Sequence, residues 1–323
     1  MVRPAGRHVV VAALLAAAWA LAPSAAAADP AGPTNARSRI VDVRPDPPGA
    51  RVDVVGGDAF LQLTVEPGHE ATVPGYGGEP YLRFREDGVV QVNGRSPATY
   101  VNGDRDGQAE VPPEADLDAP PEWERVASDG TYAWHDHRIH WMTPDHPDRA
   151  SWAVALEVDG RRVVVEGELR ALSRPVPVGA VAVAVGALGG VLLVDRRRHP
   201  AGLAALTALA AGGVAVGLGW GTWAAQPAGA GADPLVVAVP ALATGVAAAA
   251  LVGPLRRWRD VLVLAAVALV AGWSVLQLPA LWHAVVPSEL GAPAVRAGLG
   301  LVAGLVVAAG LLGVRPSRGA ASP

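Results

Sequence analysis

The sequence predicts an antiparallel, immunoglobulin-like β-sandwich followed by an all-α transmembrane bundle of five helices. Two observations predict this division. From Asp29 to Arg174 the chain carries 26 acidic residues and 15 arginines, a net charge of −11, and its apolar residues come in short runs. After Arg174 it carries nine arginines and four acids, and its apolar residues come in long runs. Such an asymmetry indicates two regions in two environments.

The first 28 residues have the pattern of a signal peptide. Arg3 and Arg7 form a charged start, residues 9–21 are apolar, and small residues occupy 25–28. We expect cleavage after one of residues 26 to 28, and an uncleaved anchor helix is the alternative. The Pro- and Gly-rich segment 29–37 is predicted to be a mobile arm.

Residues 38–173 are predicted to form the extracellular β domain. Asp159-Gly160 separates two alternating runs and suits the two-residue turn of a β-hairpin. Short strands at close spacing, with no helical period, favour an antiparallel sandwich. The segment 97–129 is rich in Pro, Asp and Glu and predicts a surface excursion. The expected strands lie at 40–43, 52–55, 60–65, 81–85, 89–92, 152–158 and 161–169.

The region 174–314 contains five apolar runs, each close to the ~20 residues that cross a bilayer as a helix. Arginines follow the first, third and fifth runs, whereas the loops 226–233 and 283–294 have none. This alternation predicts an extracellular β domain and a cytoplasmic C-terminus at 315–323. Arg296, near the outer end of the fifth run, is a mild exception. The predicted spans are 176–194, 201–224, 234–255, 261–281 and 295–314.

Composition excludes several classes of function. The chain has no cysteine, which rules out disulfides, thiolate zinc sites and iron–sulfur clusters. The acidic β domain argues against a nucleic-acid partner. No Asp, Glu, Lys or His lies in the middle of a predicted span, which argues against an ion-coupled transporter and favours an anchor or a small packed bundle. The pairs Gly217/Gly221 and Gly300/Gly304 are predicted to let helices pack closely.

The segment Thr131–Met142, TYAWHDHRIHWM, carries the strongest signal for chemistry. As a strand, it would place His135 and His137 on one face, where two imidazoles suit one metal ion. His140 would join them only if the strand bends or ends after Arg138. The predicted ion is copper or zinc, with Met142 favouring copper. The candidate ligands are His135, His137, His140, Asp136, Met142 and, from the following loop, His146.

The structural alternative for this segment is that its tryptophans belong to the core and that Asp136 pairs with Arg138. The histidines would then be surface residues with ordinary hydrogen bonds. A catalytic or pH-sensing role of the histidines is a further alternative. The sequence contains no nucleophile elbow, zinc-protease helix motif or recognisable glycosidase carboxylate pair, so it supports no particular enzyme activity.

Two further segments have a functional and a structural interpretation. Residues 102–107, NGDRDG, resemble the first half of a calcium loop, but the twelfth position is Pro113, so a solvated acidic turn is favoured. Residues 74–81, PGYGGEPY, lack the context of a phosphate loop. They predict a tight loop whose tyrosines pack under the histidine segment or face a partner.

The blocks 74–102, PGYGGEPYLRFREDGVVQVNGRSPATYVN, and 131–142 resemble a group of multi-pass actinobacterial envelope proteins that has a secreted β-rich domain and no established activity. The ending 158–172, VDGRRVVVEGELRAL, is loosely similar to the periplasmic copper-binding CopC domain, a small β-sandwich. That family binds copper through a histidine at the mature N-terminus, where this chain has Ala or Asp29.

Two hypotheses follow for the whole chain. The first is an envelope protein anchored in the lipid bilayer whose extracellular β-sandwich binds copper or zinc. The second is a non-enzymatic, membrane-anchored module that binds an envelope protein partner, or has a structural role, without metal.

Overall fold

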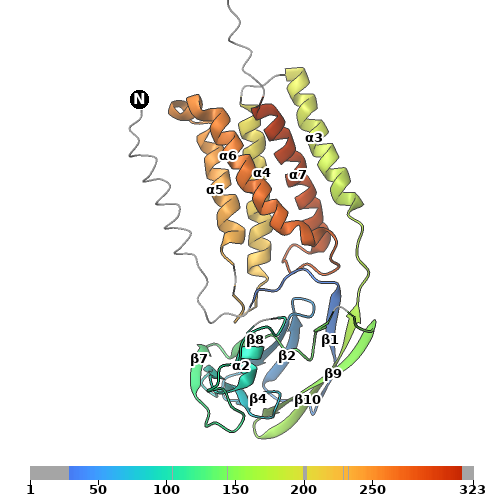
Figure 1. Ribbon diagram of the computed structural model, residues 1–323, viewed down its shortest axis with the longest axis vertical. Helices are drawn as coiled ribbons and strands as arrows, with labels where there is room; N and C mark the ends of the chain where they lie inside the picture. Colours follow the sequence, from blue (N-terminus) through green and yellow to red (C-terminus); the bar gives the residue numbers. More distant parts are fainter. Residues whose placement is uncertain are drawn as a thin grey trace, which may run out of the picture.

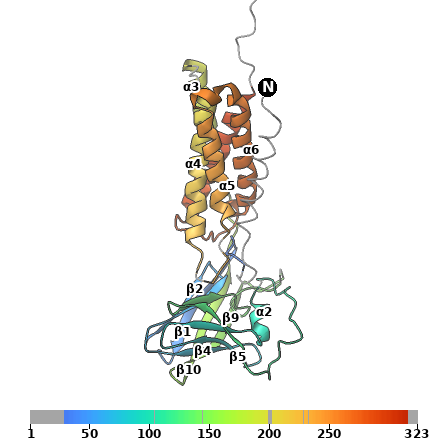
Figure 2. The same cartoon turned by 90° about the vertical axis from the view of Figure 1, so that its left-hand side faces the viewer.

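The structure, a computed structural model, describes residues 29–103, 105–143, 145–198, 202–227, 229–231 and 233–314. Within them an antiparallel β domain is followed by a helical region, which confirms the predicted order of the two parts. The two parts lie end to end along the long axis of the molecule (Figures 1 and 2). The predicted signal peptide, the C-terminal tail, Arg315 and Arg318 lie outside the described residues.

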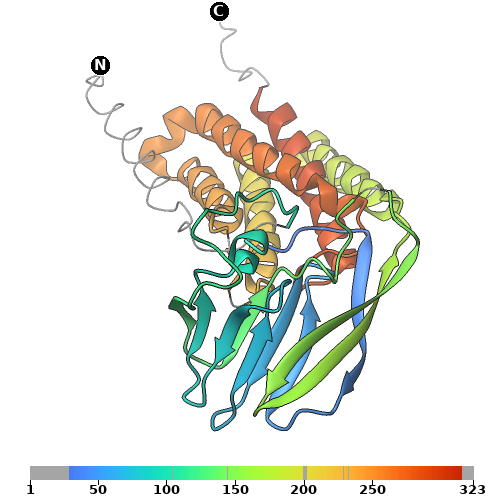
Figure 3. The same ribbon diagram turned by 60° about the horizontal axis from the view of Figure 1, so that its bottom comes forward.

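The larger sheet of the described β domain has seven antiparallel strands, which fan out below the helices in Figure 3. The chain alternates polar and apolar residues in its longest strands, because one face is buried and the other is exposed. In sheet order the strands are β1 (Ala36–Arg44), β10 (Arg161–Ala171), β9 (Arg149–Val158), β4 (Ala71–Pro74), β5 (Pro80–Phe84), β6 (Val90–Asn93) and β7 (Trp123–Ala127).

The smaller sheet has three described strands, β2 (Ala50–Val55), β3 (Phe60–Val65) and β8 (Thr131–Trp134), in the order β2-β3-β8. Both sheets contribute to one hydrophobic core, in which Leu63 and Trp134 of the smaller sheet join Val154 of the larger one. Burial of these side chains is the main favourable term for the domain. The end of β8 therefore brings the histidine segment directly to the core.

The predicted hairpin turn at Asp159-Gly160 is present between β9 and β10. Both residues have positive φ, +49° at Asp159 and +71° at Gly160, as a two-residue turn that matches strand twist requires. Val158 then pairs with Arg161, and the register continues to Arg149 opposite Arg170. The local sequence was sufficient to predict this hairpin, because the turn residues and the alternation of the flanking runs indicate the same structure.

The segment 97–129 contains regular structure that the sequence analysis missed. It begins with a short helix, α2 (Pro97–Val101), and it includes β7, which pairs with β6 at the sheet edge. The prediction of a plain surface excursion is wrong at these two elements. Ser96 caps α2 by accepting a hydrogen bond from the amide of Ala98, and Pro97 suits the first helical position.

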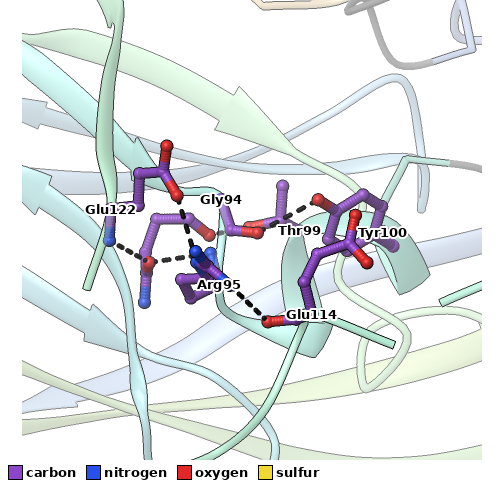
Figure 4. Close-up of polar contacts among 7 residues, drawn as sticks. Gly94, Arg95, Thr99, Tyr100, Glu114 and Glu122 are labelled. Carbon is purple, nitrogen blue, oxygen red and sulfur yellow. Dashed lines mark hydrogen bonds and ion pairs between the residues drawn. The ribbon is translucent and has the colours of Figure 1, made fainter. Parts of the chain in front are cut away.

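Hydrogen bonds hold this segment against the sheet (Figure 4). Arg95 Nε donates to Glu122 Oε2 over 3.0 Å, and its Nη1 donates to the carbonyl oxygen of Glu114 over 3.3 Å. The Tyr100 hydroxyl donates to the carbonyl oxygen of Gly94 over 3.0 Å. Arg95 thus ties both ends of the segment 114–122 to the start of α2.

Four helical segments in the described region are long and apolar enough to cross a membrane, at Val178–Arg197, Leu203–Ala224, Gly253–Leu281 and Ala292–Gly313. The run predicted at 234–255 yields a shorter helix, because the chain leaves helical geometry after residue 249 and continues as a 3-10 turn. The elements are α3 (Val178–Arg198), α4 (Leu203–Ala224), α5 (Leu235–Ala249), η1 (Gly253–Trp258), α6 (Arg259–Gln277), η2 (Leu278–Leu281) and α7 (Ala292–Gly313).

The segment 29–37, predicted to be a mobile arm, is instead docked between the two parts of the molecule. Ala31 is buried, and its backbone exchanges two hydrogen bonds with the Gln226 side chain at the end of α4. Thr34 and Val285 exchange both backbone hydrogen bonds at 3.0 Å, which forms an isolated β-bridge. The composition suggested mobility because it is a local property. The partners that hold the segment lie about 190 to 250 residues away in sequence, so no local pattern could reveal them.

Two loops of the helical region contact the β domain. Asn35 Oδ1 accepts a hydrogen bond from the amide of Ala284 over 2.8 Å. In the α4–α5 loop, Gly229 lies so close to Tyr132 that a Cβ there would come within 2.6 Å of the tyrosine ring. The β domain therefore rests on the α4–α5 and α6–α7 loops, the two that contain no arginine.

One of the two predicted glycine pairs packs two helices together. A Cβ on Gly300 or Gly304 of α7 would lie 2.1 or 2.3 Å from a carbonyl oxygen of α3. Gly217 has nothing within 4 Å of such an atom, and Gly221 faces the α6–α7 loop at Ser288. Close packing is thus found for Gly300/Gly304, whereas the prediction for Gly217/Gly221 is wrong.

Candidate functional site

The histidine segment is a strand only at its start. β8 ends at Trp134, and the chain then turns, with the amide of Ile139 donating to the carbonyl oxygen of Asp136. The Asp136 carboxylate also accepts a hydrogen bond from the amide of Arg138, an aspartate turn that replaces the strand ladder. The predicted alternation beyond Trp134 is therefore wrong, and it does not place His135 beside His137.

His135 belongs to the core of the β domain. It has no exposed surface and stacks on Phe60 with ring centroids 4.1 Å apart. Its Nδ1 lies 2.7 Å from the carbonyl oxygen of Ala59 and its Nε2 lies 3.0 Å from that of Asp29. Burial lowers the pKa of His135, which favours the neutral ring. Both nitrogens have backbone neighbours, so His135 serves to hold the chain near Asp29 against β3.

Asp136 is also fully buried, and donors occupy both of its oxygens. Arg138 donates through Nε to Oδ1 over 2.7 Å and through Nη2 to Oδ2 over 2.6 Å. The indole of Trp134 donates to Oδ2 over 3.0 Å. The guanidinium of Arg138 also lies over the ring of Tyr76, 5.1 Å from its centroid. The structure confirms the structural alternative for these residues: Trp134 is in the core and Asp136 pairs with Arg138.

Tyr76 connects this cluster to the loop 74–81. Its hydroxyl donates to Asn102 Oδ1 and accepts a hydrogen bond from the amide of His137 over 3.0 Å. Burial, and next the charge of Asp136, raise the pKa of Tyr76, so it stays protonated. The predicted packing of this loop's tyrosines under the histidine segment is thus found at Tyr76.

The histidines that do come together are His137 and His140. Their ring centroids are 5.1 Å apart and the rings meet edge to face. His140 is 4% exposed, and its Nε2–H donates to the carbonyl oxygen of Arg105 over 2.9 Å. Its Nδ1 is buried with no hydrogen-bond partner. Burial, reinforced by the charge of Arg105, lowers the pKa of His140 to about 4, so the ring is neutral at pH 7.

Met142 lies beside His137, whereas His146 stacks elsewhere. A Cβ on Gly107 would lie 3.0 Å from His137 Cε1 and 3.1 Å from Met142 Cε, so both side chains border one small space above Gly107. Met142 is 45% exposed. His146 stacks on Trp141 with centroids 4.5 Å apart, and its Nδ1 lies 3.1 Å from the carbonyl oxygen of Pro147. His137, His140 and Met142 therefore form the histidine–methionine cluster.

The segment 102–107, which resembled a calcium loop, forms one wall of this cluster. Arg105 contributes the carbonyl that orients His140, and its guanidinium pairs with the buried Asp58 over 2.9 Å. Asn102 is buried and accepts the Tyr76 hydroxyl instead of facing an ion. Asp104 lies outside the described residues. The roles of Arg105 and Gly107 could not be predicted from the sequence, because their contacts join segments about 35 residues apart.

Beside the cluster is a surface cavity of about 440 Å³ at the edge of the β domain that faces the helices. Arg105, Met142 and His146 line it, together with Arg174 on the connection to α3. Among the described residues no group of three or more His, Asp or Glu side chains is placed to hold a metal ion. Within the described part of the chain, the cluster thus offers two imidazoles and one thioether.

Comparison with known proteins leaves the chain without a match. No family model matches it, and neither a curated protein nor a solved structure is similar to it at the level of a significant match. Its function has to be inferred from the residues and their geometry.

Proposed function

We propose that this chain is a multi-pass envelope protein whose extracellular β domain binds a transition metal ion, copper or zinc. The observation that carries the proposal is the imidazole of His140, whose Nδ1 is buried without a partner and whose ring meets the ring of His137 edge to face, 5.1 Å away. Metal-bound histidines characteristically donate their second ring N–H to a backbone carbonyl, as His140 does to Arg105. His135 and Asp136 are left out of the proposed ligand set because their polar atoms already have protein neighbours.

The proposed location rests on the positions of the arginines and of the β domain at opposite ends of the helical bundle. The β domain contacts the α4–α5 and α6–α7 loops, whereas Arg196 in the last turn of α3 and Arg256 in η1 lie at the other end of the bundle (Figure 1). An extracellular β domain agrees with the preference of arginine for cytoplasmic loops. Cleavage of a signal peptide at 26 to 28 is part of the same proposal.

Five membrane crossings fit this arrangement. α4 and α6 both begin at the arginine-bearing end, so α5 has to return the chain from the outer end to that end (Figure 1). At ~1.5 Å per residue, the 15 residues of α5 are shorter than a ~30 Å bilayer core, so neighbouring helices have to shield the rest of the path. For the β domain, two facing sheets with a common core support the immunoglobulin-like class.

Single-cysteine labelling tests the location, since the natural chain has no cysteine. Ser151→Cys is on an exposed strand position, and Gly253→Cys lies in the α5–α6 turn with nothing within 4 Å of its Cβ. We expect a membrane-impermeant maleimide to label Ser151→Cys in intact cells and Gly253→Cys only after lysis. The opposite pattern would reverse the proposed orientation.

Metal binding is tested with the full chain in detergent after removal of metal with a chelator. Equilibrium dialysis against copper and against zinc should leave one tightly held ion per chain. A chain that retains neither ion in the presence of a weak competing chelator contradicts the metal-binding function. Such a result would favour the second candidate, a module without metal.

A specific observation favours that second candidate, an envelope structural or interaction module. Much of the motif 131–142 is used inside the protein, because Trp134, Asp136 and Arg138 satisfy one another and both ring nitrogens of His135 lie within 3.0 Å of backbone carbonyl oxygens. Co-purification of a defined protein from membranes, unchanged by chelator, would support it. The similarity to actinobacterial envelope proteins and to CopC domains is compatible with either candidate.

A further inference from the structure

We propose that His137, His140 and Met142 form a binding site for a monovalent copper ion at the membrane-facing edge of the β domain. The inference rests on the proposed metal-binding function and names its ion and ligands. It differs from the sequence-based ligand set, because His135 and Asp136 are in the core and His146 stacks on Trp141.

His140 is the fixed ligand of this site. Its Nε2–H is held by the Arg105 carbonyl, so the lone pair of the neutral ring lies on Nδ1, the atom without a partner. A buried polar atom without a hydrogen-bond partner costs folding free energy. A metal ion at Nδ1 would remove this cost.

Arg105 itself is held in place by a second contact. Its guanidinium pairs with Asp58, which is 1% exposed, and this pair fixes the backbone whose carbonyl orients His140. Such outer contacts set the tautomer and direction of a ligating imidazole. Asp58 and Arg105 are therefore positioning residues of the site.

Gly107 brings the other two ligands together. It has φ of +64°, a conformation that favours glycine, and a Cβ there would contact both His137 and Met142. A side chain at this position would fill the space in which the imidazole and the thioether approach each other. Both its positive φ and its close contacts with His137 and Met142 therefore favour glycine at position 107.

The donor set selects the ion. Thioether sulfur is a soft ligand that prefers monovalent copper, whereas zinc prefers four imidazole, thiolate or carboxylate ligands in a tetrahedron. Two imidazoles and one thioether meet the first preference and not the second. Met142 is 45% exposed and lines the 440 Å³ cavity, so its thioether is open to an ion that arrives from solvent.

The test uses the full-length protein in detergent, titrated without oxygen with monovalent copper against a chromogenic copper(I) chelator. Monovalent silver serves as a second soft probe that needs no reductant. We expect one copper ion per chain, and at least about tenfold weaker binding in Met142→Leu and in His137→Gln. Copper X-ray absorption should show a sulfur neighbour in the natural protein and none in Met142→Leu.

The matched controls are His146→Gln and His69→Gln, which remove histidines outside the cluster and should leave copper affinity unchanged. Met142→Leu keeps an exposed side chain of similar size, so a folding defect is not expected; unchanged amide exchange in β8 checks this. Equal copper affinity in the natural protein, Met142→Leu and His137→Gln would overturn this site and leave metal binding elsewhere intact. Tight zinc binding without copper binding would also overturn it, and absence of both ions would overturn the proposed function as well.

Discussion

Arg138 and Asp136 form a two-point ion pair, with Nε 2.7 Å from Oδ1 and Nη2 2.6 Å from Oδ2, although only one residue separates them in sequence. The carboxylate has no exposed surface, while the Arg138 side chain is 28% exposed. Trp134 donates to the same carboxylate. The pair therefore ends β8 and fixes the turn that carries His137 and His140.

Loss of the Arg138 charge should destabilise the β domain strongly. In Arg138→Met the Asp136 carboxylate stays buried without its cation, and breaking such a pair typically costs about 3–5 kcal/mol. Urea-dependent hydrogen exchange of β3 and β8 peptides measures the change. The double variant Asp136→Asn/Arg138→Met should recover much of the loss, because no charge remains buried.

Arg85 provides the matched control for this prediction. It pairs with Asp87, and both side chains are more than half exposed. Water screens the charges of an exposed pair, so Arg85→Met should change the urea midpoint little. Equal effects of Arg138→Met and Arg85→Met would mean that the buried pair has no special role.

Removing the side chains that join the two parts should loosen the junction without unfolding either part. Asn35→Ala/Gln226→Ala deletes the bonds to Ala284 and Ala31. Each bond contributes about 1 kcal/mol, so amide exchange near residues 31–35 and 284–285 should rise roughly tenfold or more. Exchange in β9 and β10 should not change. Gln277→Ala, which lines the neighbouring cavity, is the control, and an equal effect there would argue against a specific junction.

Adding a methyl group at Gly300 should separate α3 from α7. The new Cβ would lie 2.1 Å from a carbonyl oxygen of α3, a distance that requires the helices to move apart. We expect a lower melting temperature in detergent for Gly300→Ala. Gly217→Ala, with nothing within 4 Å of its Cβ, should not lower the melting temperature, because alanine favours a helix more than glycine does. A similar loss there would show that the effect of Gly300→Ala does not depend on the contact with α3.

The hairpin turn should contribute a small acid-dependent stability. Hydrogen bonds from His69 and from the Glu70 amide lower the pKa of Asp159, with smaller contributions from the charges of His69 and Arg161. The folded state therefore favours the carboxylate, whose contribution is present above the unfolded pKa of about 3.9 and is lost as pH falls through the folded pKa. The stability difference between the natural protein and Asp159→Asn should shrink as pH falls below about 4, where the carboxylate becomes protonated. A difference that grows on acidification would contradict this assignment.

Much of the architecture was predictable because its signals are local. Alternation between residues 60 and 65 identified β3, the pair Asp159-Gly160 identified the hairpin, and apolar length identified the helical segments. The short strands β4 and β7 were missed, since each has only a few residues and owes its conformation to sheet partners. The docking of residues 29–35 was missed for the same reason, as its partners are distant in sequence.

By itself, the sequence determined the order of an antiparallel β domain and an apolar helical region, because charge balance and hydrophobic period are properties of consecutive residues. It also located the histidine segment. Only the tertiary structure decided which histidines meet. Asp136 binds Arg138 and ends the strand, which moves His135 into the core, and the carbonyl of Arg105 then orients His140 beside His137. The Asp136–Arg138 pair is local, but the contacts of His135 and His140 join segments that are distant in sequence, and no local pattern encodes them.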